Sequence, residues 1–211
     1  MKNITEALMW RYATKKFDTN KKLNDEALNQ ILEAGRLSPS SFGLQPWKFI
    51  LVENTELRAK LREAGYDQAQ ITEASHVLII ASRNDLSEDY VDNYMKSTAL
   101  AQNVTVDTLS EFKSYLMNTI SSKPNAEVIK NWNARQVYIS LGIMLETAAL
   151  LEVDTCPMEG FENAKYDELL GLNELGYSSV VMLTLGYRDE SDESLKRAKS
   201  RFGTEEIIIR K

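Results

Sequence analysis

The sequence has very little of the residues that build metal centres and disulfides. Its 211 residues include one cysteine, Cys156, and one histidine, His76. One cysteine cannot form an intramolecular disulfide, and the pair cannot supply a zinc set or a two-histidine facial triad. His76 opens the apolar run HVLIIAS, so we expect a capping or core role for it and no Ser–His–Asp triad. A reducing compartment, with a cytoplasmic location as the default, is the simplest interpretation.

Long apolar runs and glycine-rich phosphate loops are missing as well. The N-terminal stretch MKNITEALMW lacks the apolar segment of a signal peptide, and no run of about 18 apolar residues could cross a membrane. Neither G-x-G-x-x-G nor G-x-x-x-x-G-K-[ST] occurs. We therefore expect any bound phosphate to be held mainly by side chains, which makes clustered Lys and Arg residues the candidates.

Positive charge is also in deficit, because 25 Lys and Arg residues face 31 Asp and Glu residues and the net charge is −6. A general nucleic-acid binder needs an excess of Lys and Arg on one face, so we expect no nucleic-acid partner. What the chain does contain is the 43% hydrophobic and 27% charged content of an ordinary globular protein. Its length suits one domain, residues 1–211, which can bury roughly 70% of the surface that the unfolded chain exposes.

Hydrophobic periodicity predicts several helices and a few strands. Apolar residues at helical spacing predict helices at 24–37, 55–64, 88–119 with a break near 104–107, and 126–151. Short apolar runs predict strands at 49–52, 76–82 and 178–187, and the proline- and serine-rich segment 38–47 predicts a loop. Consecutive strands are too far apart for hairpins. The fold class that follows is α+β, with a small sheet sandwiched by helices.

Three short stretches are candidates for a functional site: RYATKKF at 11–17, CPMEGF at 156–161 and KSRF at 199–202. The first and the last are basic clusters at opposite ends of an acidic chain, and each alone is typical of a solvated surface turn. PMEGF alone is typical of a tight turn after a strand. Spacing cannot show whether the fold brings the basic clusters together, so both interpretations stay open at this point.

In this order along the chain, the stretches resemble a known family. Arg11, Lys15 and Phe17, the loop PSSFGLQPW at 39–47, the turn PMEGF at 157–161 and the terminal KSR resemble the FMN-dependent nitroreductases. The oxygen-insensitive NAD(P)H nitroreductases and the dihydropteridine reductase-like flavoproteins look most similar, over about residues 3–202. The resemblance implies a mostly antiparallel sheet in a domain-swapped-type homodimer, with two FMN sites at the interface that are built from both chains.

The resemblance gives the basic residues a role at both ends of the cofactor. Arg11, Lys199 and Arg201 match the ligands of the FMN phosphate, and charge-assisted bonds to a phosphate are the strong kind. Lys15 matches the cation beside flavin N1 and the C2 oxygen. The ring gains negative charge there on reduction, so a cation raises the reduction potential.

The turn matches the segment that lies against the flavin ring, where Pro157 packs on the ring and Met158 follows it. The backbone N–H groups of Glu159 and Gly160 match those that face flavin N5 and O4, and a glycine lets the backbone approach closely. Cys156 invites an interpretation as a redox thiol, but we expect a small apolar filler beneath the turn.

The loop and the long helix carry the expectation of a homodimer. Pro39, Ser40 and Ser41 match residues that touch the neighbour's FMN. The helix at 126–151 is apolar around much of its circumference, so we expect it at the centre of an obligate dimer. The C-terminal EEIIIRK is expected to reach onto the partner, because its isoleucines would otherwise expose an aggregation-prone strand.

Five further positions match cofactor contacts but depart from the family in residue type. Tyr12 replaces a basic residue, Ala13 stands where serine is common, and Gly43 stands where asparagine is frequent. Asp67 occupies the position of an asparagine that bonds the ring edge, and Gln70 stands where some members have lysine. An acid at that edge would disfavour the reduced anionic flavin, so we expect Asp67 to turn away or neighbouring glutamines to substitute for it.

The function that the resemblance implies is electron transfer from NAD(P)H through flavin N5 to a nitroaromatic, quinone or similar small acceptor by a ping-pong mechanism. No catalytic protein residue is required, because the chemistry belongs to the cofactor. The residues Phe112, Tyr115, Leu116 and Met117, within 106–124, match an insert that shapes the acceptor site, although ordinary helix packing explains them equally well. Two alternatives stay open: a flavin-dependent oxidase or dehalogenase of the same fold, and a non-enzymatic FMN-binding or regulatory dimer.

Overall fold

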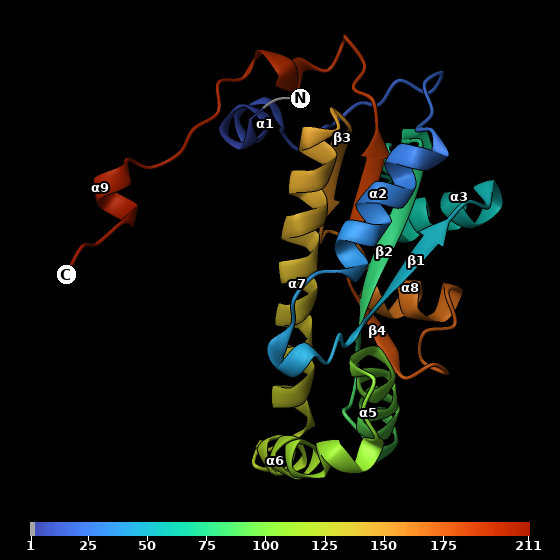
Figure 1. Ribbon diagram of the computed structural model, residues 1–211. Coiled ribbons are helices and arrows are strands. Elements are labelled where there is room, and N and C mark those ends of the chain that lie inside the picture. The colour runs from blue at the N-terminus through green and yellow to red at the C-terminus, as the bar shows by residue number, and fades with distance from the viewer. Residues whose placement is uncertain (1–2) are drawn as a thin grey trace.

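A four-stranded antiparallel sheet lies at the centre of the molecule, in a computed structural model that describes residues 3–211. Its strands are β1 (Trp47–Val52), β2 (His76–Arg83), β3 (Asp154–Met158) and β4 (Tyr177–Gly186), and their order is β1-β2-β4-β3. All three pairings are antiparallel. The α+β prediction of a small, mostly antiparallel sheet between helices is confirmed (Figure 1).

The apolar run in β2 explains why helices must cover both faces of this sheet. Leu78 and Ile80 pack with the helices α2 (Asp25–Arg36) and α7 (Ala126–Leu150). Val77 and Ile79 pack on the other face with α3 (Thr55–Ala64), α4 (Gln70–Glu73) and α8 (Asn163–Leu169). Successive side chains of a strand point to opposite faces, and burying each of these contributes roughly 1.5–3 kcal/mol. A continuous apolar strand therefore requires a layer of helices on each side.

The 25-residue helix α7 spans the length of the sheet and connects the two ends of the molecule (Figure 1). It begins after Pro124, where the side chain of Asn125 accepts a hydrogen bond from the N–H of Val128 at 3.1 Å. The short helix α1 (Ile4–Trp10) and the C-terminal segment lie near one end of α7. The helices α5 (Glu88–Gln102) and α6 (Ser110–Ser121) lie near its other end.

The helices α5 and α6 build a small core of their own. Met95 and Leu116 are fully buried there, together with Leu44 from the loop before β1. Between the two helices, Asn103 adopts a left-handed conformation with φ 54° and is followed by the 3-10 turn η2 (Val106–Leu109). Leu116, from the expected acceptor-site insert, therefore has a packing role, whereas Tyr115 is 62% exposed.

The C-terminal segment leaves the body of the molecule after β4. It passes through the 3-10 turn η3 (Glu193–Lys196) and ends beyond the short helix α9 (Thr204–Ile207), which stands apart from the remaining elements (Figure 1). Its apolar residues face solvent in the single chain: Phe202 is 76% exposed and Ile209 is 79% exposed. Among residues 3–211, no helix is long and apolar enough to span a bilayer.

Candidate functional site

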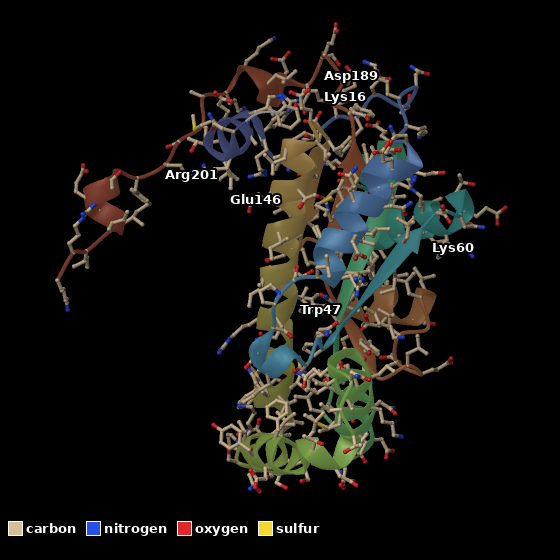
Figure 2. The ribbon with its side chains drawn as sticks, viewed as in Figure 1. Lys16, Trp47, Lys60, Glu146, Asp189 and Arg201 are labelled. Atoms are coloured by element: carbon tan, nitrogen blue, oxygen red, sulfur yellow. The ribbon has the colours of Figure 1, made fainter. Side chains whose placement is uncertain are left out.

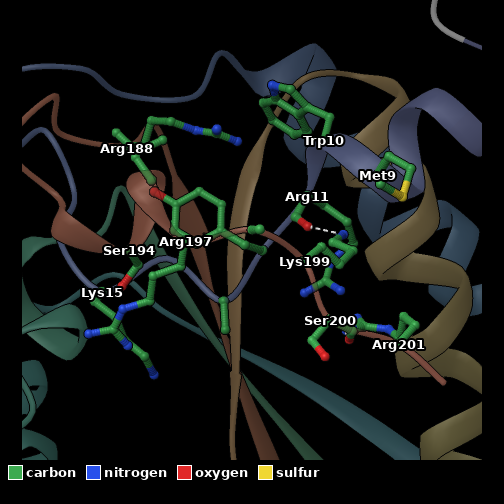
Figure 3. Close-up of a pocket in the computed structure, with 14 residues that line it drawn as sticks. Met9, Trp10, Arg11, Lys15, Arg188, Ser194, Arg197, Lys199, Ser200 and Arg201 are labelled. Carbon is green, nitrogen blue, oxygen red and sulfur yellow. Dashed lines mark hydrogen bonds between the residues drawn. The ribbon is translucent and has the colours of Figure 1, made fainter.

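A cavity of about 540 Å³ lies between the segment that follows α1 and the C-terminal segment after η3. Figure 3 shows side chains from both segments pointing into it. Two stretches separated by more than 170 positions in the sequence therefore line the same cavity. The lining residues include six of basic type, which are Arg11, Lys15, Arg188, Arg197, Lys199 and Arg201.

Arg11, Lys199 and Arg201 form a cluster of positive charge in this cavity. The Lys199 ammonium donates hydrogen bonds to the backbone carbonyls of Leu8 and Arg11, which fixes the C-terminal segment against the end of α1. Figure 3 marks the bond to Arg11. Burial, and the nearby charges of Arg11 and Arg201, lower the pKa of Lys199 from its usual value. Burial and the charge of Arg201 likewise lower the pKa of Arg11. The structure thus holds like charges together at an electrostatic cost.

No carboxylate compensates this cluster within residues 3–211. Neither Asp nor Glu lines the cavity, and none of the ion pairs between described residues involves Arg11, Lys199 or Arg201. The Nε atom of Arg11 is buried without a hydrogen-bond acceptor in the described part of the chain. Buried donors are normally paired, and an orphaned one requires an explanation. A bound anion would supply both the acceptor and the missing negative charge.

Asp192 fixes the loop that carries Lys15. One oxygen of its carboxylate accepts hydrogen bonds from the backbone N–H groups of Lys15 at 2.8 Å and Lys16 at 3.2 Å, and from the Tyr12 hydroxyl at 3.1 Å. The other oxygen accepts from the N–H of Ser194 at 2.8 Å, at the start of η3. Burial and the hydrogen bond to Asp192 raise the pKa of Tyr12 to about 12, so its hydroxyl stays a donor.

Arg188 also lines the cavity and is held in place by an ion pair. Its Nε donates to the Asp154 carboxylate at 2.7 Å, and Asp154 is only 4% exposed. The guanidinium lies 4.1 Å from the centre of the Trp10 ring and 4.7 Å from that of Tyr12. Such cation–π contacts add to the ion pair. Arg188 is therefore a structural cation whose charge Asp154 balances, unlike those of the cluster formed by Arg11, Lys199 and Arg201.

Lys15 lies between this cavity and β3. Its Nζ atom is 3.8 Å from the Sγ atom of Cys156, which is fully buried in the core beneath the turn. Burial raises the pKa of the Cys156 thiol, although the charge of Lys15 acts in the opposite direction. A buried, protonated thiol has the properties of an apolar filler and not those of a reactive thiolate. That role of Cys156 stays a prediction.

The expected turn begins in the edge strand β3, where Pro157 and Met158 pair in register with Leu183 and Met182 of β4. An edge position suits a proline because it has no N–H to donate. Beyond the strand, the backbone N–H groups of Glu159 and Gly160 have no acceptor among the described residues and are free for a ligand. A second cavity, of about 370 Å³, adjoins the turn and is lined by Tyr138, Leu141, Pro157, Glu159 and Val181.

The structure does not bring the loop around Ser40 to the cation cluster of the same chain. The N–H of Ser41 donates to Gln136 of α7 at 2.8 Å, and neither Pro39, Ser40, Ser41 nor Gly43 lines the larger cavity. Gly43 has φ +70°, and a Cβ atom there would lie 2.7 Å from the Tyr94 hydroxyl oxygen. Glycine adopts this positive φ without strain, so the conformation of the loop itself explains a glycine at this position.

The segment 67–70 meets the turn through Gln68, one of the two glutamines, with Gln70, that are expected to substitute for Asp67. Asp67 accepts a hydrogen bond from Arg62 at 2.6 Å, and Gln70 is buried at 7% exposure. Gln68 instead donates its amide to the carbonyls of Gly160 at 2.7 Å and Gly65 at 2.9 Å. The contacts of Asp67 and Gln70 with a flavin stay predictions.

The structure thus assembles Arg11, Tyr12, Ala13, Lys15, Lys199 and Arg201 around one cavity and adds residues that the sequence did not indicate. Asp192, Arg188 and Asp154 are the main additions. Asp192 lies in the acidic stretch DESDES at 189–194, where nothing distinguishes it from its neighbours. Asp154 is the first residue of β3 and is buried, and a buried charge needs a partner, but its partner Arg188 lies 34 positions away in the sequence.

Comparisons with known proteins identify the family of the chain. The model of the Nitroreductase family matches residues 8–187. A Bacillus subtilis protein named "Putative NAD(P)H nitroreductase YfkO" is 38% identical over 97% of this chain and 96% of its own length. A Staphylococcus epidermidis protein of the same description is 36% identical over 97% of this chain and 95% of its own. A crystal structure from Exiguobacterium sibiricum, described as a nitroreductase in complex with FMN, has a TM-score of 0.83 at 23% identity, with 100% of this chain and 98% of that chain covered.

Proposed function

The chain belongs to the nitroreductase family, and on that premise we propose that it is an FMN-dependent oxidoreductase. It uses NAD(P)H as the electron donor and a nitroaromatic, quinone or similar small molecule as the acceptor. The observation that carries the proposal is the convergence of Arg11, Lys199 and Arg201 in one cavity without a compensating carboxylate among the described residues.

The residues of the cavity fit a flavin mononucleotide. A phosphate group with nearly two negative charges offers several acceptor oxygens. It would satisfy the orphaned Nε of Arg11 and offset the mutual repulsion that, after burial, lowers the pKa values of Arg11 and Lys199. A guanidinium and an ammonium make the strong, charge-assisted hydrogen bonds to such a group. Arg11, Lys199 and Arg201 would therefore hold the phosphate end of the cofactor.

The other end of the cofactor finds its partners at the turn after β3. The unpaired N–H groups of Glu159 and Gly160 would donate to polar atoms of the ring, and Pro157 offers it an apolar contact. The ammonium of Lys15, held near Cys156, would lie at the edge of the ring that gains negative charge. They are the residues that the resemblance assigns to the ring end of the cofactor.

When bound, FMN would supply the redox chemistry by carrying electrons from NAD(P)H to the acceptor in the two half-reactions of a ping-pong mechanism. The protein residues bind and orient. The cluster of cations fixes one end of the cofactor, and Lys15 stabilises negative charge at the other. No described side chain in the cavity is a histidine or carboxylic acid suited to general acid–base catalysis, and none is needed.

The active form is a homodimer, since the single chain leaves two of its parts without a partner. The loop with Pro39, Ser40 and Ser41 lies away from the cation cluster of its own chain, as expected if it completes the neighbour's site. The C-terminal tail exposes Phe202 and the isoleucines at 207–209. Exposed apolar tails of this kind mark an interaction surface. Sedimentation should show a dimer for the full chain; a stable, FMN-loaded monomer would contradict this.

Steady-state turnover tests the proposal. The purified, FMN-loaded protein should oxidise NADH or NADPH only when menadione or a nitroaromatic is present, and double-reciprocal plots should give parallel lines. Absence of turnover with tightly bound FMN would favour the alternative of a non-enzymatic, FMN-binding dimer. Rapid consumption of oxygen, with no need for another acceptor, would favour an oxidase of the same fold. A cytoplasmic location stays a prediction that rests on the single cysteine.

A further inference from the structure

We infer that Asp192 is the positioning residue that joins the two ends of the cofactor site. The inference rests on the proposed function, because the residues that Asp192 positions are those assigned above to the phosphate and to the ring. Asp192 itself lines neither cavity. It acts through the segments to which it is bonded.

The geometry of its hydrogen bonds carries the inference. Asp192 is only 4% exposed, and one of its carboxylate oxygens accepts from the Tyr12 hydroxyl and from the N–H groups of Lys15 and Lys16. The second oxygen accepts from the N–H of Ser194. One buried carboxylate therefore fastens the loop at 12–16 to the first residues of η3. A buried charge that uses both of its oxygens in this way holds a defined geometry.

The loop at 12–16 and the segment after η3 carry the residues proposed for the ring end and the phosphate end of the cofactor. The loop carries the ammonium of Lys15, which faces β3, whereas η3 leads within a few residues to Lys199 and Arg201. The C-terminal segment has little other support, since Lys199 bonds to backbone carbonyls at the end of α1 and the tail beyond it is exposed. Loss of Asp192 should therefore loosen Lys15 and the phosphate-binding residues together.

The neighbouring Asp189 provides a matched control. It lies on the same loop and close to Lys16, 3.8 Å from its ammonium (Figure 2), but its carboxylate is bonded to Ser191 and lines neither cavity. Asp189→Asn removes the same charge as Asp192→Asn, three residues away. An effect of the lost charge alone would appear in both variants. An effect of the hydrogen bonds that position Lys15 and the C-terminal segment should appear only in Asp192→Asn.

The test measures the FMN and riboflavin dissociation constants and the reduction potential of the bound flavin in the holoprotein. In Asp192→Asn, FMN binding should weaken by about 10- to 100-fold, equivalent to roughly one lost charge-assisted bond, with a smaller loss for riboflavin. The potential should become more negative, because the Lys15 ammonium is no longer held. Tyr12→Phe removes one of the four bonds and should move both quantities in the same direction by less. Asp189→Asn should match the parent.

Several results would overturn the inference. A more positive potential in Asp192→Asn would mean that only the removed negative charge matters. Lower thermal stability with unchanged FMN affinity and potential would mean a purely structural role. If Asp192→Asn fails to fold, Tyr12→Phe decides, and a Tyr12→Phe protein identical to the parent refutes the inference. A parent protein that binds no flavin would instead refute the proposed function, so the two failures are distinguishable.

Discussion

Replacing Arg11 by methionine should weaken FMN binding without lowering the free energy of unfolding of the apoprotein. Methionine keeps an unbranched stem of similar length and removes the charge and the orphaned Nε donor. The hydrogen bonds of Lys199 survive the change, because they are made to the backbone carbonyls of Leu8 and Arg11 and not to the Arg11 side chain. The substitution therefore isolates the contribution of the guanidinium to the anion site.

The expected magnitudes follow from the structure. A hydrogen bond to a charged group contributes about 1.5–3 kcal/mol, so FMN affinity should fall by roughly 10- to 150-fold. Riboflavin has no phosphate, and its affinity should change by only about two- to three-fold. In the apoprotein, Arg11 is partly desolvated and beside like charges, so its removal should leave the free energy of unfolding unchanged or raise it by about 1 kcal/mol.

Flavin fluorescence titration and denaturant unfolding of the apoprotein measure the two quantities. Lys60→Met is a suitable control, since Lys60 is exposed on α3, away from Arg201 and the cavity (Figure 2). It removes the same charge and should leave FMN affinity unchanged. Equal losses for FMN and riboflavin in Arg11→Met, or a less stable apoprotein with FMN affinity intact, would refute the assignment of Arg11 to the phosphate.

Three further predictions concern Lys15, Cys156 and Asp192. Lys15→Met should make the flavin potential more negative and lower the turnover number at saturating FMN, whereas unchanged values would remove Lys15 from the ring. Cys156→Ala should lower the free energy of unfolding by about 1 kcal/mol and leave turnover within a few-fold; a collapse of turnover at normal FMN content would make the thiol catalytic. Burial disfavours the charged form of Asp192, but hydrogen bonds, first that from Lys15, lower its pKa below the usual 3.8. Its stabilising contribution should therefore be complete above pH 3.8 and be lost as the pH falls through the lowered pKa. Denaturant unfolding between pH 2 and 5 should show the free energies of unfolding of Asp192→Asn and the parent converging at the acid end.

The helices were predictable because their signals are local. The helix predicted at 24–37 is α2, and Asn24 caps it, since its side chain accepts a hydrogen bond from the N–H of Ala27 at 2.8 Å. The helix at 126–151 is α7, which ends one residue earlier than predicted. The edge strand β3 was not predicted as an element, since its five residues begin with the polar Asp154 and Thr155. Their burial depends on distant partners such as Arg188, which no local pattern indicates.

The candidate site was predictable in its residues but not in its assembly. The basic clusters are visible in the sequence, yet the bond between Lys199 and the Arg11 carbonyl joins positions that lie 188 residues apart. Only the resemblance to the family placed them together, and the structure brings them to one cavity. Asp192 could not be distinguished from Asp189 by sequence, because what separates them is burial and bonding geometry.

An anaerobic titration of the FMN-loaded protein with NADH and NADPH tests the central claim most directly. The account predicts that at least one of the two nicotinamides bleaches the oxidised flavin spectrum at about one equivalent per bound FMN, and that added menadione or nitroaromatic restores it. A flavin that stays oxidised with an excess of both nicotinamides, in a protein that holds FMN through Arg11, Lys199 and Arg201, would contradict the assignment as an NAD(P)H-dependent oxidoreductase.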